Sequence, residues 1–129
     1  MSNTTIPVVD IDRIGDPDTL DALDEACREW GFFQIVNHGI DEDVLAEILA
    51  HARAFFRLPL EEKRAISRTA ENSWGFFDNE LTKNTRDWKQ IFDYGPQEGD
   101  ARRPQWPATL PDFCPSVLEY YAACEGLAF

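Results

Sequence analysis

The chain has 129 residues, of which 43% are hydrophobic, and a formal net charge of −12. This length predicts one domain, and the apolar content is sufficient for a folded core. The chain has 24 acidic and 12 basic residues, and this negative charge disfavours binding to nucleic acid. No run reaches the roughly 18 apolar residues that a membrane span needs. We therefore expect a cytoplasmic protein.

The first 31 residues predict a strand followed by a helix. Residues 6–11 (IPVVDI) form a β-branched run that is typical of an opening strand. Asp16 and Pro17 are the residue types that begin a helix, and an apolar stripe with spacings of three and four continues over residues 17–30. Gly31 is expected to end this helix.

A second strand is expected directly after the helix. Residues 32–37 open with FFQIV, a run rich in β-forming side chains that predicts a strand buried on both faces. The strand should stop at Asn37, His38 and Gly39, which have the residue types of a structural turn. For His38 this indicates a hydrogen bond to the backbone.

The next segment predicts two helices. Asp41 is a helix-capping residue, and residues 41–57 carry the strongest helical period of the chain. Pro59 breaks this helix and begins a short helix over residues 59–66. The nearby basic side chains, together with His51, are interpreted as a solvated surface. These basic residues are Arg53, Arg57, Lys63, Arg64 and Arg68.

The remaining residues alternate between loops and regular elements. Residues 67–87 are polar and predict an extended loop, whereas residues 88–94 (WKQIFDY) predict a strand. A helix is expected over residues 115–129. Because its apolar stripe continues to the last residue without a helix terminator, we expect that the chain is truncated within this helix.

Residue chemistry alone gives no catalytic site. Cys27, Cys114 and Cys124 form no C-x-x-C pair and are interpreted as small core residues. No Gly-rich phosphate loop occurs. The sequence therefore predicts no catalytic, cofactor-binding or metal-binding residue.

Four segments resemble a known family, in the family's order. They are GFFQIVNHGI, AFFRLPLEEKRAI, WGFFDNELTKN and DWKQIFDYGP. These segments resemble the N-terminal region of the iron(II)/2-oxoglutarate-dependent dioxygenases of the isopenicillin N synthase type. The resemblance implies an α/β (α+β) domain over residues 1–129 that packs on a jelly-roll barrel, and this barrel is absent here.

The same resemblance implies chemistry that this chain does not carry. Members of the family hold Fe(II) with His-x-Asp and a distant His, and they grip 2-oxoglutarate with Arg-x-Ser. Here the histidines read HGI at His38 and HAR at His51, and Arg-x-Ser is absent. Fe(II) and 2-oxoglutarate are thus implied for a complete enzyme that oxidises a small organic substrate, and the chain alone is expected to be inactive.

Full-length relatives use segments like 67–94 to cover the mouth of the barrel. The resemblance therefore implies a substrate-pocket lining, although aromatic side chains, Trp88 among them, are more often core residues. The residues that would line the pocket are Trp74, Phe76, Phe77, Lys89 and Phe92. A second hypothesis stays open, in which the chain is a free-standing, non-catalytic binding or regulatory module that pairs with another chain.

Overall fold

The computed structural model describes residues 5–128, which divide into two compact units. The first unit contains the residues up to Ile40 together with the last residues of the final helix, from Gly126 onward. The second unit contains residues Asp41–Glu125. The described residues form a mixture of helices and short strands without a closed barrel, as expected for an α/β (α+β) domain.

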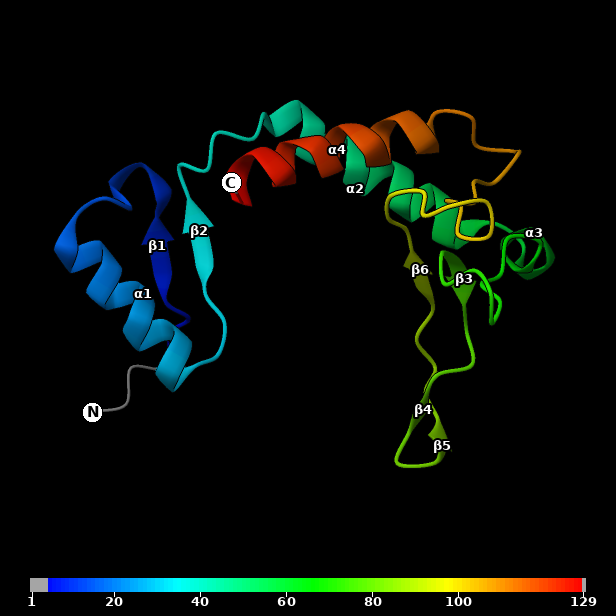
Figure 1. Cartoon of the computed structure of the whole chain (residues 1–129), viewed down its shortest axis with the longest axis horizontal. Helices are drawn as coiled ribbons and strands as arrows, with labels where there is room; N and C mark the ends of the chain where they lie inside the picture. The colour runs from blue at the N-terminus through cyan, green and yellow to red at the C-terminus, as the bar shows by residue number, and fades with distance from the viewer. Residues whose placement is uncertain (1–4, 129) are drawn as a thin grey trace. The chain divides into compact units, whose positions relative to one another are not determined.

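A helix and two parallel strands make up the first unit. Strand β1 (Val8–Asp10) pairs with β2 (Gln34–Val36), and a short 3-10 helix (Ile11–Arg13) and α1 (Pro17–Glu29) connect them. Figure 1 shows α1 running beside the two strands. Val9 of β1 and Ala26 of α1 are both buried. The helix therefore covers one face of a two-stranded sheet.

The ends of α1 lie at the residues that were expected to flank it. Asp16 occupies the N-cap position and Pro17 lies in the first turn. The Asp16 carboxylate makes no capping hydrogen bond and instead accepts the Nε–H of Arg13 at 3.0 Å. At the other end, Gly31 has a φ of +74°, and its N–H donates to the carbonyl of Ala26 at 3.1 Å. Glycine is the residue that best tolerates this left-handed conformation after a helix.

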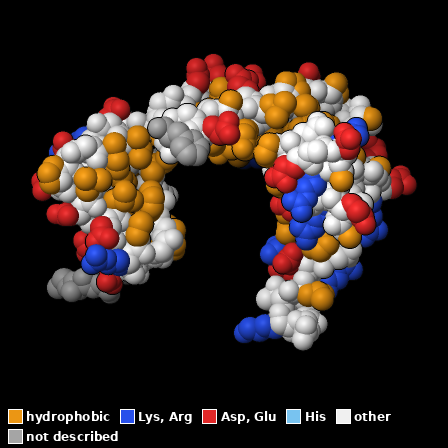
Figure 2. Space-filling model, in the orientation of Figure 1, with side chains coloured by type: hydrophobic (Ala, Val, Ile, Leu, Met, Phe, Trp, Pro, Cys, Tyr) orange, Lys and Arg blue, Asp and Glu red, His pale blue; other side chains and the backbone are white. Residues whose placement is uncertain are grey.

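The expectation that strand 32–37 is buried on both faces is wrong. Phe32 is 54% exposed and Val36 is 41% exposed. Only one face of a two-stranded sheet can be covered by α1, and Figure 2 shows hydrophobic side chains at the surface of this unit. Cys27, expected in the core, is exposed as well, whereas its neighbour Ala26 is the buried residue of α1.

The second unit is built on three helices. They are α2 (Glu42–Arg57), α3 (Leu60–Arg64) and α4 (Phe113–Ala128), of which α4 continues into the first unit. Asp41 caps α2 as predicted, because its Oδ1 accepts the N–H of Asp43 at 2.9 Å. Helix α4 begins two residues earlier than expected, and the last residue of its predicted range, Phe129, lies outside the described residues.

Strands occupy part of the segment that was expected to be a loop. Strand β3 (Gly75–Phe77) pairs antiparallel with β6 (Ile91–Asp93). Between them, β4 (Leu81–Thr82) and β5 (Thr85–Arg86) form a hairpin. Its turn residues Lys83 and Asn84 have φ values of +51° and +61°, the left-handed geometry that suits a two-residue hairpin turn.

An aromatic core joins the helices of the second unit to the β3–β6 pair. Phe55 of α2 and Phe76 of β3 have no exposed surface. The ring of Phe55 stacks on that of Phe113 at a centroid distance of 5.0 Å and lies 4.9 Å from Phe92. The second unit therefore has its own packed interior.

Two side chains near this core differ from their predicted environments. Trp88, expected to be a core residue, is 85% exposed. It lies in the segment between β5 and β6, outside both strands. Lys63, expected on a solvated surface, is 4% exposed. Helical spacing alone did not reveal that α3 turns this lysine toward the interior.

Candidate functional site

The candidate substrate-side residues are positioned by the β3–β6 pair. Phe76 lies opposite Phe92 in the register, and Phe77 lies opposite Ile91. Successive side chains of a strand point to opposite faces. Phe76 and Phe92 pack in the aromatic core, so Phe77 and Ile91 lie on the other face of the pair. Phe77 and Ile91 are both half-buried on this second face.

A half-buried part of this outer face carries an ion pair that the sequence did not reveal. Arg68 lies with its guanidinium carbon 3.6 Å from the centroid of the Phe77 ring, and it donates to Asp93 at 2.9 Å. Both charged side chains are about one third exposed. Arg68 comes from the segment after α3, which an isolated bridge between Ser67 and Phe76 holds beside β3. No local sequence signal indicates this long-range pairing.

Trp74 stands at the end of the β3–β6 pair. Its indole N–H donates to the carbonyl of Pro96 at 3.1 Å. Its ring lies so close to Gly95 that a Cβ atom there would come within 2.4 Å of the ring carbon Cζ2. The absence of a side chain at Gly95 thus allows the indole to pack on the backbone after β6.

Lys89 lies in the exposed segment before β6. Its ammonium is 3.7 Å from the Oδ2 of Asp87, and its backbone N–H donates to the Oδ1 of the same carboxylate. The backbone hydrogen bond from Lys89 lowers the pKa of Asp87 below its ordinary value, with a smaller contribution from the hydroxyl of Thr82 and from the Lys89 charge. The lysine is therefore held beside a carboxylate that stays ionised.

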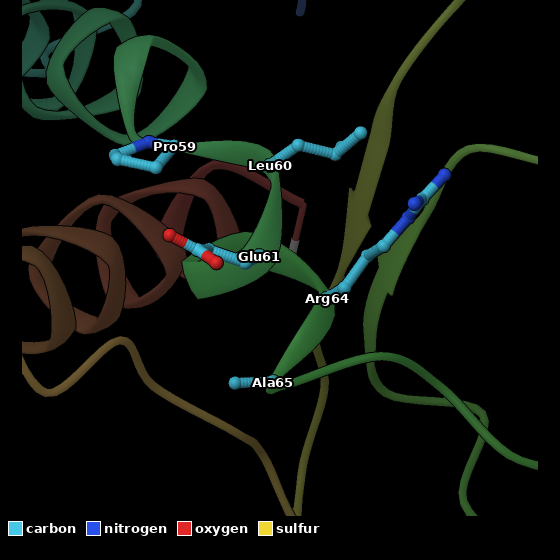
Figure 3. A pocket seen from close by; sticks show the side chains of 5 residues that line it. All are labelled: Pro59, Leu60, Glu61, Arg64 and Ala65. Carbon is cyan, nitrogen blue, oxygen red and sulfur yellow. The ribbon is translucent and has the colours of Figure 1, made fainter.

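The five candidate residues do not converge on one cavity in the described chain. Phe76 and Phe92 meet in the core, whereas Trp74, Phe77 and Lys89 lie at separate positions around the β3–β6 pair. An open cavity of about 680 Å³ lies instead over α3. Figure 3 shows Glu61 and Arg64 of this cavity pointing in different directions. Arg64 is already paired with Asp78 at 2.7 Å, so the cavity offers no convergent charges.

The two histidines lie in different units and in different settings. His38 belongs to the turn after β2, where its Nδ1 accepts the N–H of Ile40 at 3.1 Å. Asn37 and Gly39 on either side both have positive φ values. His51 of α2 was expected at the surface, but it is half-buried and its Nδ1 has no hydrogen-bond partner in the described structure. It faces α4, a packing that its position in the helical period did not reveal.

The described residues do not fit an iron site. Among residues 5–128, no three His, Cys, Asp or Glu side chains are grouped as a metal ion requires. A non-haem iron oxygenase site needs two histidines and one carboxylate on one face of the metal.

Within residues 5–128, no helix combines the length and apolar character that crossing a membrane requires.

Comparison with known families identifies the domain. The model of the family described as "non-haem dioxygenase in morphine synthesis N-terminal" matches residues 6–116. The chain belongs to this family of N-terminal domains of 2-oxoglutarate- and iron(II)-dependent oxygenases.

Curated relatives share about a third of their aligned residues with the chain. Protein SRG1 of Arabidopsis thaliana is 35% identical over 124 residues, which cover 92% of this chain and 35% of that protein. Flavanone 3-dioxygenase of Petroselinum crispum is 36% identical over 129 residues, which cover 91% of this chain and 34% of that enzyme. The chain thus spans about a third of the length of these relatives.

Solved structures support the same fold. A structure of JOX2 in complex with 2OG, Fe and JA matches with a TM-score of 0.76 and 25% identity, and the match covers 97% of this chain and 38% of that one. A 2OG-Fe(II) oxygenase family protein from Caulobacter crescentus matches with a TM-score of 0.76 and 19% identity, over 98% of this chain and 46% of that one. Each of these oxygenase chains extends well beyond the matched part.

Proposed function

We propose that the chain is the N-terminal, substrate-side domain of a non-haem Fe(II)/2-oxoglutarate-dependent oxygenase that oxidises a small organic substrate. The observation that carries this proposal is the family match over residues 6–116. In the complete enzyme, a C-terminal jelly-roll domain would supply the iron and 2-oxoglutarate ligands, for which the described residues offer no matching set. The chain alone would then be inactive.

The outer face of the β3–β6 pair is our candidate for the substrate side. Phe77 offers an aromatic surface there, whereas Trp74 and Lys89 lie beyond opposite ends of the pair. Phe76 and Phe92 would support this wall from behind, because both pack in the core. In the complete enzyme, Phe77 would supply apolar contact to a small organic substrate, and Lys89, which is paired with Asp87, would supply a polar contact at one end of the pair.

Exposed apolar side chains in the first unit favour a missing neighbour. Val8, Phe32, Phe33 and Val36 are all exposed in the described residues. Apolar surface of this kind usually marks an interface. In the proposed enzyme, the jelly-roll domain would be the part that covers it.

Two measurements test the proposal. The reading frame beyond the codon for Phe129 should encode His-x-Asp, a later His and Arg-x-Ser. The complete protein should then form succinate from 2-oxoglutarate in the presence of Fe(II) and O2, whereas residues 1–129 should not. A continuing frame that lacks these motifs would contradict the proposal.

The aromatic core of the second unit favours one alternative function. Because Phe55 and Phe76 are fully buried within that unit, the chain has an interior of its own and could act as a free-standing binding module. A monodisperse monomer with a cooperative thermal transition supports the module, and aggregation supports the oxygenase domain.

For either function we propose a cytoplasmic location. Cys27, Cys114 and Cys124 are free thiols, and free thiols suit a reducing compartment.

A further inference from the structure

A third segment extends the β3–β6 pair on the other side of β3. The N–H of Phe76 donates to the carbonyl of Ile66 at 2.9 Å, and the N–H of Arg68 donates to the carbonyl of Phe76 at 3.0 Å. A Cβ atom at Gly75 would clash with the carbonyl oxygen of Ile66 and lie 3.0 Å from the nitrogen of Arg68, so glycine permits this close approach. The backbone of Arg68 is therefore fixed to β3.

The side chain of Arg68 crosses the outer face from β3 to β6. Its guanidinium carbon lies 3.6 Å from the centroid of the Phe77 ring, and its Nη1 donates to the Oδ2 of Asp93 at 2.9 Å. Phe77 belongs to β3, and Asp93 of β6 lies opposite Gly75 in the register. At this distance the guanidinium stacks on the ring. A molecule that contacts Phe77 on this face therefore also meets the Arg68–Asp93 pair.

Both members of the Arg68–Asp93 pair are accessible. The side chain of Arg68 is 32% exposed and that of Asp93 is 36% exposed. A guanidinium has five N–H donors and an ionised carboxylate has two acceptor oxygens. The hydrogen bond between the two side chains therefore leaves further donors and acceptors for a second molecule. A bound ligand would replace solvent at these groups.

The charges of the Arg68–Asp93 pair determine which molecule it suits. The two charges compensate each other, and a carboxylate bound to Arg68 would lie close to the carboxylate of Asp93, which is unfavourable. An uncharged molecule avoids this repulsion. The pair presents a donor beside an acceptor, and a carboxamide or lactam presents the complementary acceptor beside a donor. Because a guanidinium is planar and stacks on aromatic rings, a flat ligand is favoured.

We propose that Arg68 and Asp93 determine the substrate specificity of the oxygenase proposed above by binding an uncharged aromatic carboxamide or lactam. Arg68 donates to the carbonyl oxygen of the ligand, Asp93 accepts its N–H, and the aromatic ring lies against the guanidinium. The substrate role of this pair rests on the proposed function, because the C-terminal domain would supply the rest of the pocket.

Benzamide and benzoate are matched probes for this preference. They have nearly the same shape, but benzamide is neutral and has N–H donors, whereas benzoate is an anion at neutral pH. In ¹H–¹⁵N NMR spectra of residues 1–129, benzamide should saturably shift the Arg68 Nε–H and the Asp93 amide. Benzoate should bind about threefold or more weaker than benzamide. The chain has no Arg-x-Ser motif, so benzoate has no 2-oxoglutarate site to occupy.

A third probe tests the contribution of stacking. Cyclohexanecarboxamide has the same carboxamide group as benzamide, but its ring is neither flat nor aromatic. It should bind about twofold or more weaker than benzamide, because the contact between an aromatic ring and the guanidinium is lost. Equal binding of the two carboxamides would contradict the stacked geometry.

Variants of the pair should change which probe is preferred. In Asp93→Asn the charge of Arg68 is no longer compensated, so benzoate should bind about threefold or more tighter than benzamide, the reverse of the parent. Arg68→Lys keeps the charge but loses the planar group and should weaken benzamide binding about threefold or more. Glu98→Gln is the matched control, because it breaks another arginine–carboxylate pair of the second unit, with Arg102 at 3.0 Å. It should leave the preference within about twofold of the parent.

Three further results would overturn the inference. They are the absence of saturable shifts at Arg68 and Asp93 with benzamide, equal binding of benzamide and benzoate by the parent, and the same preference in Asp93→Asn as in the parent. Circular dichroism melts identify any variant that unfolds, and Arg68→Lys together with the parent then decides.

The titration needs neither iron nor 2-oxoglutarate, so the two proposals fail separately. The expected probe preference without succinate formation by the complete protein would refute the oxygenase function. Succinate formation by the complete protein without this preference in the chain would refute the role of Arg68 and Asp93.

Discussion

The ammonium group of Lys63 donates a 2.8 Å hydrogen bond to the carbonyl oxygen of Phe56, in the last turn of α2. A second bond of 2.8 Å joins the same ammonium to the Oε1 of Gln90, just before β6. A cation at the C-terminus of a helix satisfies a free carbonyl and interacts favourably with the helix dipole. Lys63 therefore connects the end of α2 to the segment that leads into β6.

Replacing Lys63 with Met should destabilise the second unit. The carbonyl of Phe56 and the amide of Gln90 would lose their donor in a part-buried setting, which costs about 1–3 kcal/mol of unfolding free energy. Urea denaturation measures the change. Arg53→Met on the exposed side of α2 is the control and should stay within about 0.5 kcal/mol of the parent. Equal losses in both variants would mean that the buried lysine contributes nothing specific.

A side chain at Gly95 should disturb the end of the β3–β6 pair. In Gly95→Ala the new Cβ would lie 2.4 Å from the Cζ2 of Trp74, so the indole must move. Forced shifts of this kind typically cost about 1–3 kcal/mol, and the thermal transition should fall by several degrees. Gly126→Ala is the matched control, because apart from its chain neighbours and the backbone of its own helix, nothing lies within 4 Å of the added Cβ. It should leave stability unchanged or raise it by up to about 1 kcal/mol, as alanine favours a helix.

The hairpin of β4 and β5 should loosen in acid. The backbone N–H of Lys89 holds the pKa of Asp87 below its ordinary value of 3.8, so the ionised carboxylate stabilises the folded hairpin. This contribution is present above the unfolded pKa and is lost as the pH falls through the lowered folded pKa. Amide hydrogen exchange at Lys89 should therefore accelerate, relative to the intrinsic rate, below about pH 4. In Asp87→Asn this additional acid dependence should disappear, and its persistence would exclude Asp87 as the cause.

The three thiols should differ in reactivity. Cys27 is exposed, Cys114 and Cys124 are half-buried, and burial raises the pKa of the Cys114 thiol. The thiolate is the reactive form. In the isolated chain, iodoacetamide should modify Cys27 first and Cys114 more slowly, as measured by peptide mass spectrometry. Faster labelling of Cys114 than of Cys27 would contradict the observed packing.

Local signals predicted the parts of the fold that depend on neighbouring residues. The N-cap positions at Asp16 and Asp41 and the stop at Gly31 were evident in the sequence, because each signal lies within a few residues of its helix end. The pairing of β3 with β6 was not evident, since its partners lie about fifteen residues apart and the segment between them reads as polar. The exposure of Phe32 depends on what covers the sheet, which periodicity does not reveal.

The candidate site was predictable to a smaller extent. The resemblance predicted that the segment containing Trp74 and Phe77 lies on the substrate side. The sequence does not show that Phe76 lies in the core and Phe77 on the outer face, because this depends on the pairing of β3 with β6. The contact between Arg68 and Phe77 depends on a bridge formed across the chain.

Iron binding by the purified chain tests the central claim most directly. The 129 residues contain two histidines, and these lie in separate units, without a third ligand grouped beside either in the described part. Anaerobic titration with Fe(II), read by calorimetry and by metal analysis after gel filtration, should give no stoichiometric uptake, and no succinate should form above the protein-free blank. One tightly bound iron per chain that is lost in His38→Ala or His51→Ala would contradict the account.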